Sequence, residues 1–181
     1  KVVKFGGSSL ASAEQFKKVG DIIRSDSERK FVVPSAPGKR NSKDTKVTDM
    51  LYATYAFAEK GNDFTKALKG IEARYQEIID GLKLELDLTS EFDKIVENFK
   101  KKAGDNYAAS RGEYLNGIIM ANYLGYEFID AKDVIVFDEN GVFLEYATYN
   151  GNYYGTPKDK IIEKLNKKII KLRLNCNRSN Q

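Results

Sequence analysis

The sequence predicts an α/β fold built on a parallel sheet, and three observations point to it. Residues 1–5 form a short, apolar, β-branched run that ends at Gly6, as expected of a strand that enters a tight turn. A helical pattern follows, and residues 31–34 form a second apolar run. A strand, a helix and a strand within about 35 residues are typical of the βαβ unit of a parallel sheet.

The first helix is predicted by its start signal and by its spacing. Ser12 and Gln15 have the spacing of a capping box, and the apolar residues that follow at helical spacing are Phe16, Val19, Ile22 and Ile23. After the second strand, a polar loop runs to Lys46, and apolar spacing predicts helices around residues 47–54, 64–79 and 92–99. No strand separates the last two, so residues 62–103 are interpreted as a helical insertion or lid.

Strands return in the last third of the chain. A helix around residues 115–123 is expected to stop at Gly125, since glycine often ends a helix. Strands are predicted at residues 127–130, 134–137 and 142–146, and the last two would form a hairpin through Asn140-Gly141. A final helix is expected to open at Thr156-Pro157 and to continue through Ile169.

The composition excludes several chemistries. The chain has 181 residues, no histidine and one cysteine, Cys176. Ser-His and Cys-His catalysis, imidazole metal sites, an internal disulfide and a cysteine zinc cluster are therefore excluded. A single cysteine favours a reducing, cytoplasmic setting. No run reaches the ~18 apolar residues of a membrane span, and no signal-peptide pattern is present, so no membrane partner is expected.

The net charge of +4 is unevenly placed. Residues 151–181 contain eight Lys and Arg against two Asp and Glu, so the first 150 residues are slightly acidic. A protein that grips nucleic acid normally spreads its basic surface over the folded domain. Nucleic acid is therefore not an expected partner, and residues 150–181 are interpreted as a divergent basic tail.

Two loops after predicted strands could bind a ligand. Residues 4–9, Lys-Phe-Gly-Gly-Ser-Ser, would bring backbone N–H groups and the Lys4 charge to a phosphate, or would simply make a tight turn. Residues 34–38 end the second strand similarly, and Ser35 and Thr48 could contact a ligand or cap local structure. The lysines and arginine of residues 39–46 are typical of a solvated loop. Glu113 could hold an ammonium group or pair with Arg111 on an exposed helix face.

The combination of motifs resembles the aspartate kinases of the amino acid kinase family. Lys-Phe-Gly-Gly-Ser-Ser-Leu at residues 4–10 is similar to their N-terminal motif, and residues 32–36 with 46–51 are similar to their second block. Residues 111–115, Arg-Gly-Glu-Tyr-Leu, resemble their Gly-Glu helix start, and residues 133–137 resemble the strand that follows. The resemblance covers residues 1–149.

The resemblance implies a three-layer αβα sandwich around a mostly parallel sheet, apparently incomplete here. It implies ATP-dependent phosphorylation of the L-aspartate side chain to 4-phospho-L-aspartate with Mg²⁺, the first step of lysine, threonine and methionine biosynthesis. Lys4 would be the catalytic residue and would bind phosphate with Gly6, Gly7 and Ser8, while Ser35, Thr48 and Glu113 would bind aspartate. No metal ligand is assigned.

The resemblance fades after residue 150, where the family continues with the adenine-binding half of its sheet. The chain by itself is therefore expected to lack competent kinase activity, and the complete form is expected to be a homo-oligomer. Two other interpretations stay open. One is a non-catalytic remnant that binds a ligand or partner, and the other is a sibling amino acid kinase that acts on a different acid.

Overall fold

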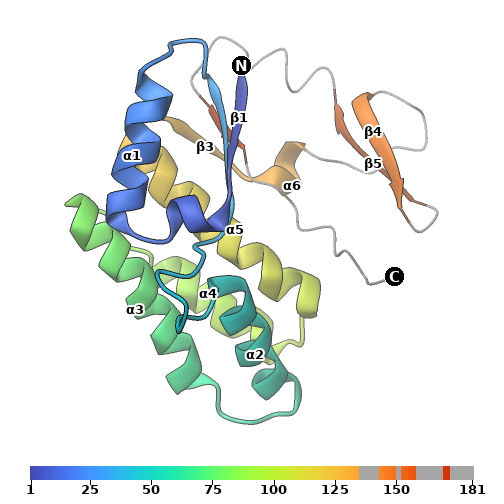
Figure 1. Cartoon of the computed structure of the whole chain (residues 1–181). Helices are drawn as coiled ribbons and strands as arrows, with labels where there is room; N and C mark the ends of the chain where they lie inside the picture. The colour runs from blue at the N-terminus through green and yellow to red at the C-terminus, as the bar shows by residue number, and fades with distance from the viewer. Residues whose placement is uncertain (135–142, 150–151, 158–168, 172–181) are drawn as a thin grey trace.

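A four-stranded parallel sheet organises the computed structural model, which describes residues 1–134, 143–149, 152–157 and 169–171 (Figure 1). Its strand order is β1 (Val2–Phe5), β2 (Phe31–Pro34), β6 (Ile169–Lys171) and β3 (Glu127–Ile129), and each neighbouring pair runs parallel. Parallel neighbours need a crossover connection, which α1 supplies between β1 and β2. The predicted α/β fold with a parallel sheet is confirmed.

The β1–α1–β2 unit forms where the sequence predicts it. A short 3₁₀ helix, η1 (Gly7–Leu10), follows β1, and α1 spans Ala13–Arg24. Ser12 caps α1, because its hydroxyl accepts a hydrogen bond from the Gln15 backbone N–H at 3.4 Å. The buried face of the helix consists of Phe16, Val19, Gly20 and Ile23.

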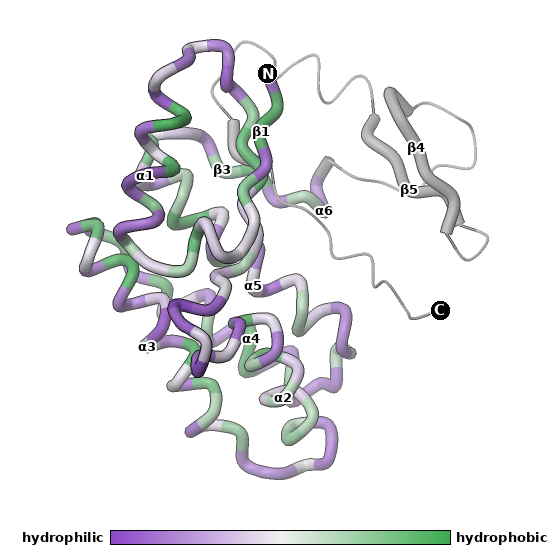
Figure 2. Tube along the Cα trace, in the orientation of Figure 1, coloured by the Kyte–Doolittle hydropathy of each residue, from purple (hydrophilic) through white to green (hydrophobic). Residues whose placement is uncertain are grey.

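Four helices form most of the hydrophobic core below the sheet (Figure 1). They are α2 (Val47–Glu59), α3 (Thr65–Leu82), α4 (Thr89–Lys100) and α5 (Asp105–Leu124). Tyr55, Tyr75 and Phe99 are among the largest fully buried side chains, and the rings of Tyr55 and Phe99 meet edge to face at 5.2 Å. Figure 2 shows hydrophobic and hydrophilic segments alternating along α1 and α3, as expected of helices with one buried face.

The long helix α5 starts earlier than the sequence indicates. It ends at Gly125, which adopts a left-handed conformation with φ of 67°, as predicted. The Arg111-Gly112-Glu113 segment is expected at a helix start, but it lies inside α5, so that expectation is wrong. Gly112 is needed for packing instead, because a Cβ there would lie 2.7 Å from the Ala36 Cβ.

The two faces of the sheet are covered unequally. Val3 and Phe5 pack into the core that contains the buried residues of α1 and α5, and Val32 is fully buried there. The alternate residues of β1 point to the other face, where Val2 remains 68% exposed and Lys4 is also exposed. This side of β1 is therefore exposed in the part of the chain that the structure describes.

Several predictions for the last third of the chain need correction. Val134 lies in a short helix, α6 (Ala131–Val134), while the rest of the predicted strand and the Asn140-Gly141 turn lie outside the described residues. The strand expected at 142–146 is β4 (Phe143–Tyr149), which pairs antiparallel with β5 (Asn152–Pro157).

The predicted final helix is contradicted at both of its described ends. Thr156 and Pro157 belong to β5, and Ile169 belongs to β6. A short apolar run has no periodicity that separates a helix from a buried strand, and β6 lies between β2 and β3, where a continuous apolar strand is favoured. The domain boundary at residue 149 and the interpretation of residues 62–103 as an insertion stay predictions.

Candidate active site

The candidate site lies where β1 and β2 end side by side. Phe5 is in register with Pro34, so the two strands release their following loops at the same edge of the sheet. The Ser35 N–H donates a hydrogen bond to the Phe5 carbonyl at 3.0 Å, which continues the pairing into the loops. We call residues 6–12 the first loop and residues 35–46 the second loop. In open α/β sheets, ligands bind at this edge.

Two glycines allow the loops to interlock. The Gly38 N–H donates a hydrogen bond to the Gly7 carbonyl at 2.8 Å. A Cβ on Gly38 would lie 2.6 Å from the Gly7 carbonyl carbon, and one on Gly7 would lie 2.9 Å from the Ala36 carbonyl oxygen. Both positions therefore require glycine. The sequence predicts Gly7 as a site residue but not Gly38, although Gly38 also closely follows a strand.

A cavity of about 420 Å³ opens between the loops, and we call it the site cavity. Five of the seven predicted site residues line it, although they come from four separate segments of the sequence. Its lining consists of Gly7, Ser8, Ser35, Ala36, Pro37, Gly38, Lys39, Lys46, Thr48 and Glu113. The remaining two predicted residues, Lys4 and Gly6, are not part of this lining.

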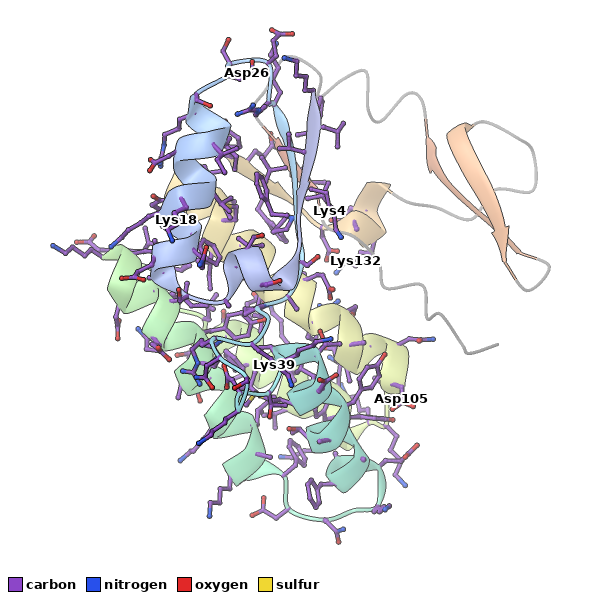
Figure 3. All side chains as sticks on the ribbon, in the orientation of Figure 1. Lys4, Lys18, Asp26, Lys39, Asp105 and Lys132 are labelled. Carbon is purple, nitrogen blue, oxygen red and sulfur yellow. The ribbon has the colours of Figure 1, made fainter. Side chains whose placement is uncertain are left out.

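Lys4 and Gly6 lie beside the cavity rather than in its wall. Lys4 is the third residue of β1, on the exposed face of the sheet, and Figure 3 shows its side chain leaving the strand on the side away from α1. Gly6 precedes η1, and its carbonyl accepts a hydrogen bond from the Ser9 N–H at 3.1 Å. Both residues are therefore next to the first loop, but the roles predicted for them stay predictions.

Glu113 reaches the cavity because α5 packs closely on the second loop. At Gly112 the missing side chain lets α5 approach Ala36, and a Cβ at this position would lie 3.8 Å from the Thr48 hydroxyl oxygen. Glu113 is only 5% exposed. Arg111, the alternative ion-pair partner, stacks instead on Tyr107 and Tyr114, with ring-centroid distances of 4.7 and 4.4 Å. The interpretation as an exposed ion pair is wrong.

The Glu113 charge influences the tyrosines around it. Burial raises the pKa of Tyr75 well above its usual value of 10.0, and the negative charge of Glu113 adds to this effect. Burial also raises the pKa of Tyr52, with contributions from the charges of Asp105 and Glu113. Both phenols therefore stay protonated near neutral pH.

The basic residues of the second loop have two different environments. Lys39 and Lys46 line the site cavity, whereas Arg40 pairs with Asp44 at 2.8 Å and with Glu77 at 2.6 Å. The Asp44 carboxyl accepts hydrogen bonds from the side chain and backbone of Arg40, which hold its pKa well below the usual value of 3.8. Lys39 and Lys46 are both exposed, so the interpretation of the run as a solvated loop is confirmed for these two lysines.

Two side chains that sequence reasoning missed support the cavity wall beside Ser35 and Glu113. The Asn116 amide donates a hydrogen bond to the Ser35 carbonyl at 2.6 Å, and the Tyr75 hydroxyl donates to the Gly112 carbonyl at 2.8 Å. Both residues are fully buried. Asn116 carries no signal in the sequence, because a polar residue inside a helix is normally expected on its solvent face. Tyr75 fits the apolar spacing of residues 64–79, which predicts its burial but not its hydrogen bond.

Two features are absent from the part of the chain that the structure describes. This part of the chain holds no cluster of three or more acidic, cysteine or histidine side chains that could bind a metal ion. None of its helices is long and apolar enough to cross a membrane.

Backbone amides, hydroxyls, lysines and one carboxylate meet at this edge of the parallel sheet, which makes it a candidate site for a charged small ligand in an α/β protein. The comparison with known proteins is more specific. A sequence model of the amino acid kinase family matches residues 1–173, and the chain belongs to this family. The match extends beyond the residues that carry the motif resemblance.

The similar proteins include aspartate kinases. Aspartokinase 3 of Bacillus subtilis is 37% identical over 154 residues, which cover 77% of this chain and 33% of the relative. A bifunctional aspartokinase/homoserine dehydrogenase of Arabidopsis thaliana is 28% identical over 157 residues, 75% of this chain and 16% of the relative. The chain therefore spans a third or less of these curated relatives.

Solved structures agree with the fold. The crystal structure of Clostridium acetobutylicum aspartate kinase is 44% identical and superposes with a TM-score of 0.80, covering 94% of this chain and 38% of that one. Escherichia coli aspartokinase III in complex with aspartate and ADP superposes with a TM-score of 0.66 at 19% identity, covering 94% of this chain and 40% of that one. The second likeness supports the fold alone.

Proposed function

We propose that the protein carrying this sequence is an aspartate kinase. It transfers the γ-phosphoryl group of ATP, bound as its Mg²⁺ complex, to the side-chain carboxylate of L-aspartate and forms 4-phospho-L-aspartate. This reaction begins the biosynthesis of lysine, threonine and methionine. The main support is the convergence of Gly7, Ser8, Ser35, Thr48 and Glu113 on one cavity of about 420 Å³.

The phosphate side of the proposed site is the first loop. The backbone of Gly6, Gly7 and Ser8 would bind phosphate oxygens, since peptide N–H groups after a strand and before a helix favour an anion. Lys4 would stabilise the charge that develops on the transferred phosphoryl group. The positive charges of Lys39 and Lys46 in the cavity wall also favour an anionic ligand.

The aspartate side is formed by Ser35 at the start of the second loop and by two helices. The hydroxyls of Ser35 and Thr48 would hydrogen-bond the substrate. The Glu113 carboxylate would pair with its ammonium group, since a buried carboxylate is a strong acceptor for a charged donor. This arrangement selects an amino acid, because an acid without an α-ammonium group would leave Glu113 without its substrate contact.

The proposed chemistry needs no basic side chain. The nucleophile is a carboxylate with a pKa of about 4, which is already ionised at neutral pH. Catalysis then consists of positioning the two substrates and stabilising phosphoryl charge, as is general for phosphoryl transfer. A chain without histidine is compatible with this reaction.

The proposal concerns the whole protein. Because the chain spans 38% of the solved Clostridium enzyme, we propose that residues 1–181 alone do not form a complete nucleotide site. We also propose that the complete form is cytoplasmic, given one cysteine in 181 residues, and that it is a homo-oligomer.

The test is an acyl phosphate assay with the native-length protein. Hydroxylamine trapping should give product with L-aspartate and ATP, and little with L-glutamate or N-acetylglutamate. Glu113→Gln should raise the KM for aspartate about tenfold or more, as expected for loss of a hydrogen bond to a charged group. Equal product with N-acetylglutamate would favour a sibling kinase, and no product with any acid would favour a non-catalytic binding protein.

A further inference from the structure

The helix α3, which belongs to neither loop, carries a buried arginine beside the candidate site. Arg74 lies in the middle of α3 and is 4% exposed, which is unusual for an arginine. Arg74 lies outside the family motifs at residues 4–10, 32–36 and 46–51. A buried guanidinium must be paired and hydrogen-bonded, so its partners indicate what it does.

The partners of Arg74 belong to both loops. Its Nη2 donates a hydrogen bond to the Ala11 carbonyl at 2.8 Å, in the first loop. The same nitrogen donates to the Gly38 carbonyl at 3.1 Å, in the second loop. Arg74 is therefore a bridge between the segments that also meet through the Gly38 N–H and the Gly7 carbonyl.

Two acidic residues hold the guanidinium in this place. Asp44 lies 3.3 Å from Nη2, and Glu77 lies 3.7 Å from Nη1. Arg40 pairs with both of these carboxylates, so the four side chains form a neutral cluster behind the second loop. Burial and the nearby charge of Arg40 lower the pKa of Arg74, but the two carboxylates oppose this and an arginine remains charged.

We infer that Arg74 is a positioning residue for the phosphate side of the site: it fixes the separation of the first and second loops, and thereby the placement of the Gly7, Ser8 and Gly38 backbone. This inference rests on the proposed phosphate-binding role of the first loop. Arg74 does not line the site cavity, so it acts through the loop backbone rather than by touching the ligand.

The consequence is that α3, part of the segment interpreted as an insertion, contributes to the active site. Asn116 and Tyr75 hold the Ser35 and Gly112 carbonyls on the aspartate side. The carbonyls held by Arg74 belong to Ala11, in the first loop, and to Gly38, whose N–H bonds to Gly7. Loss of Arg74 should therefore affect ATP more than aspartate. A general loss of stability would not separate the two substrates in this way.

The experiment uses three variants of the native-length protein. Arg74→Met keeps an unbranched stem without donors, Arg74→Lys keeps the charge with a shorter reach, and Ile71→Val is a matched control at a fully buried position of the same helix. Amide hydrogen exchange is measured for the loop residues and for α4. The KM values for ATP and aspartate and kcat are measured in parallel.

Arg74→Met should speed exchange of the Gly38 amide roughly tenfold or more relative to α4, as expected when a charge-assisted hydrogen bond is lost. The KM for ATP should rise and kcat/KM for ATP should fall by on the order of 100-fold, the effect of a misplacement of about 1 Å. The KM for aspartate should change much less. Arg74→Lys should recover part of both effects, and Ile71→Val should show neither.

Unchanged exchange at Gly38 in Arg74→Met, or an ATP effect no larger than the aspartate effect, would overturn the inference. If Arg74→Met does not fold, the same readouts on Arg74→Lys decide, since an intermediate ATP-selective loss supports the inference and wild-type values refute it. If the wild-type protein phosphorylates no amino acid, the proposed function fails. The exchange measurement still decides whether Arg74 holds the two loops.

Discussion

Two cavities of the described region differ in size and in what forms their walls. The larger one, about 620 Å³, lies among the helices, and we call it the helical cavity. Its apolar lining includes Phe64, Leu68, Phe92 and Val96, and its rim includes Lys69 and Lys100. The site cavity is about 420 Å³ but gathers loop backbone, hydroxyls and Glu113 at the ends of two strands.

The comparison teaches that volume is a poor guide to the site. The lining of the helical cavity comes mostly from α3, α4 and the turn before α3, and its apolar side chains belong to or pack against the hydrophobic core. The walls of the site cavity are held by specific hydrogen bonds, such as Asn116 to Ser35 and Gly38 to Gly7. Groups held in fixed positions can recognise a ligand, because little rearrangement is needed when it binds.

The largest difference between the two regions is expected when the charge of Lys4, beside the site cavity, is removed. In the native-length protein, Lys4→Ala should lower kcat about 100- to 1000-fold, the usual loss when one stabilising group of a transition state is removed. The KM for aspartate should change far less. Lys69→Ala, on the helical cavity, is the matched control and should leave kcat unchanged. Equal losses in turnover and aspartate affinity would contradict the role proposed for Lys4.

Glycine substitutions should give opposite results in the two regions. Gly38→Ala places a Cβ against the Gly7 backbone at 2.6 Å and should destabilise the protein by about 1–3 kcal/mol while weakening ATP binding. At Gly70 in α3, the nearest atom to an added Cβ is the Met50 Cε at 3.9 Å. Gly70→Ala should therefore stabilise the protein by about 0.5–1 kcal/mol.

Urea unfolding of the native-length variants measures both free energies of unfolding, and ADP titration of the same proteins measures their nucleotide affinity. A tolerated Gly38→Ala variant with unchanged affinity would show that the close approach of the two loops is not required. The Gly70→Ala variant controls for the general effect of adding a methyl group, since its expected sign is the opposite.

The two regions should also differ in how pH changes the stability contributed by one of their acidic residues. The pKa of Asp44 is lowered in the folded protein, so its stabilisation is present above the usual value of 3.8 and is lost as the pH falls below it. Asp44→Asn should cost about 2 kcal/mol of unfolding free energy at pH 7, the scale of hydrogen bonds to a charged group. This difference should shrink as the pH is lowered from about 5 to about 2.

Asp63 is the matched carboxylate on the helical cavity. Hydrogen bonds from the Thr65 side chain and from the Thr65 N–H, the latter at 2.9 Å, lower its pKa, but its carboxylate is exposed. Asp63→Asn should have a smaller effect on the urea midpoint at neutral pH. The idea of a built charge cluster behind the second loop is wrong if the Asp44→Asn difference is the same at pH 3 as at pH 7.

The smallest expected difference is in ADP affinity, between a lysine of the site cavity and a lysine of the helical cavity. Lys46→Ala should weaken ADP binding only a few-fold, since an exposed charge contributes about 0.2–1 kcal/mol. Lys100→Ala, on the helical cavity, should have no effect on ADP binding. Calorimetric titration of both variants at low and moderate salt checks this. A larger loss of ADP affinity for Lys100→Ala than for Lys46→Ala would show that the nucleotide binds in the helical cavity and not in the site cavity.

The sequence predicts which residues lie at the loop-bearing edge of β1 and β2, because the signals for this edge are local. Gly6, Gly7 and Ser35 directly follow apolar runs, and neighbouring parallel strands bring such positions together. Glu113 is different. Its residue type allows either an ammonium contact or an ion pair with Arg111, and only the family resemblance favours the first. Its environment depends on how Gly112 packs on Ala36. Arg74 could not be found, because its burial is decided by carbonyls far away in the sequence.

The error in the last third of the chain has a physical cause. A run of a few apolar residues fits a buried helix and a central strand equally well, and its environment decides between them. Ile169 and Ile170 pair with Phe31 and Val32 on one side and with Glu127 and Phe128 on the other. Neither neighbour can be identified from the sequence near residue 169.

The position of β6 also has a consequence for the order in which the protein is made. The helices from α2 to α5 form from consecutive residues and can begin to pack while later residues are still being synthesised. The open side of β2 acquires its partner only when residues 169–171 leave the ribosome. Until then β2 and β3 expose unpaired backbone, so the nascent chain would be prone to aggregate through the middle of its future sheet.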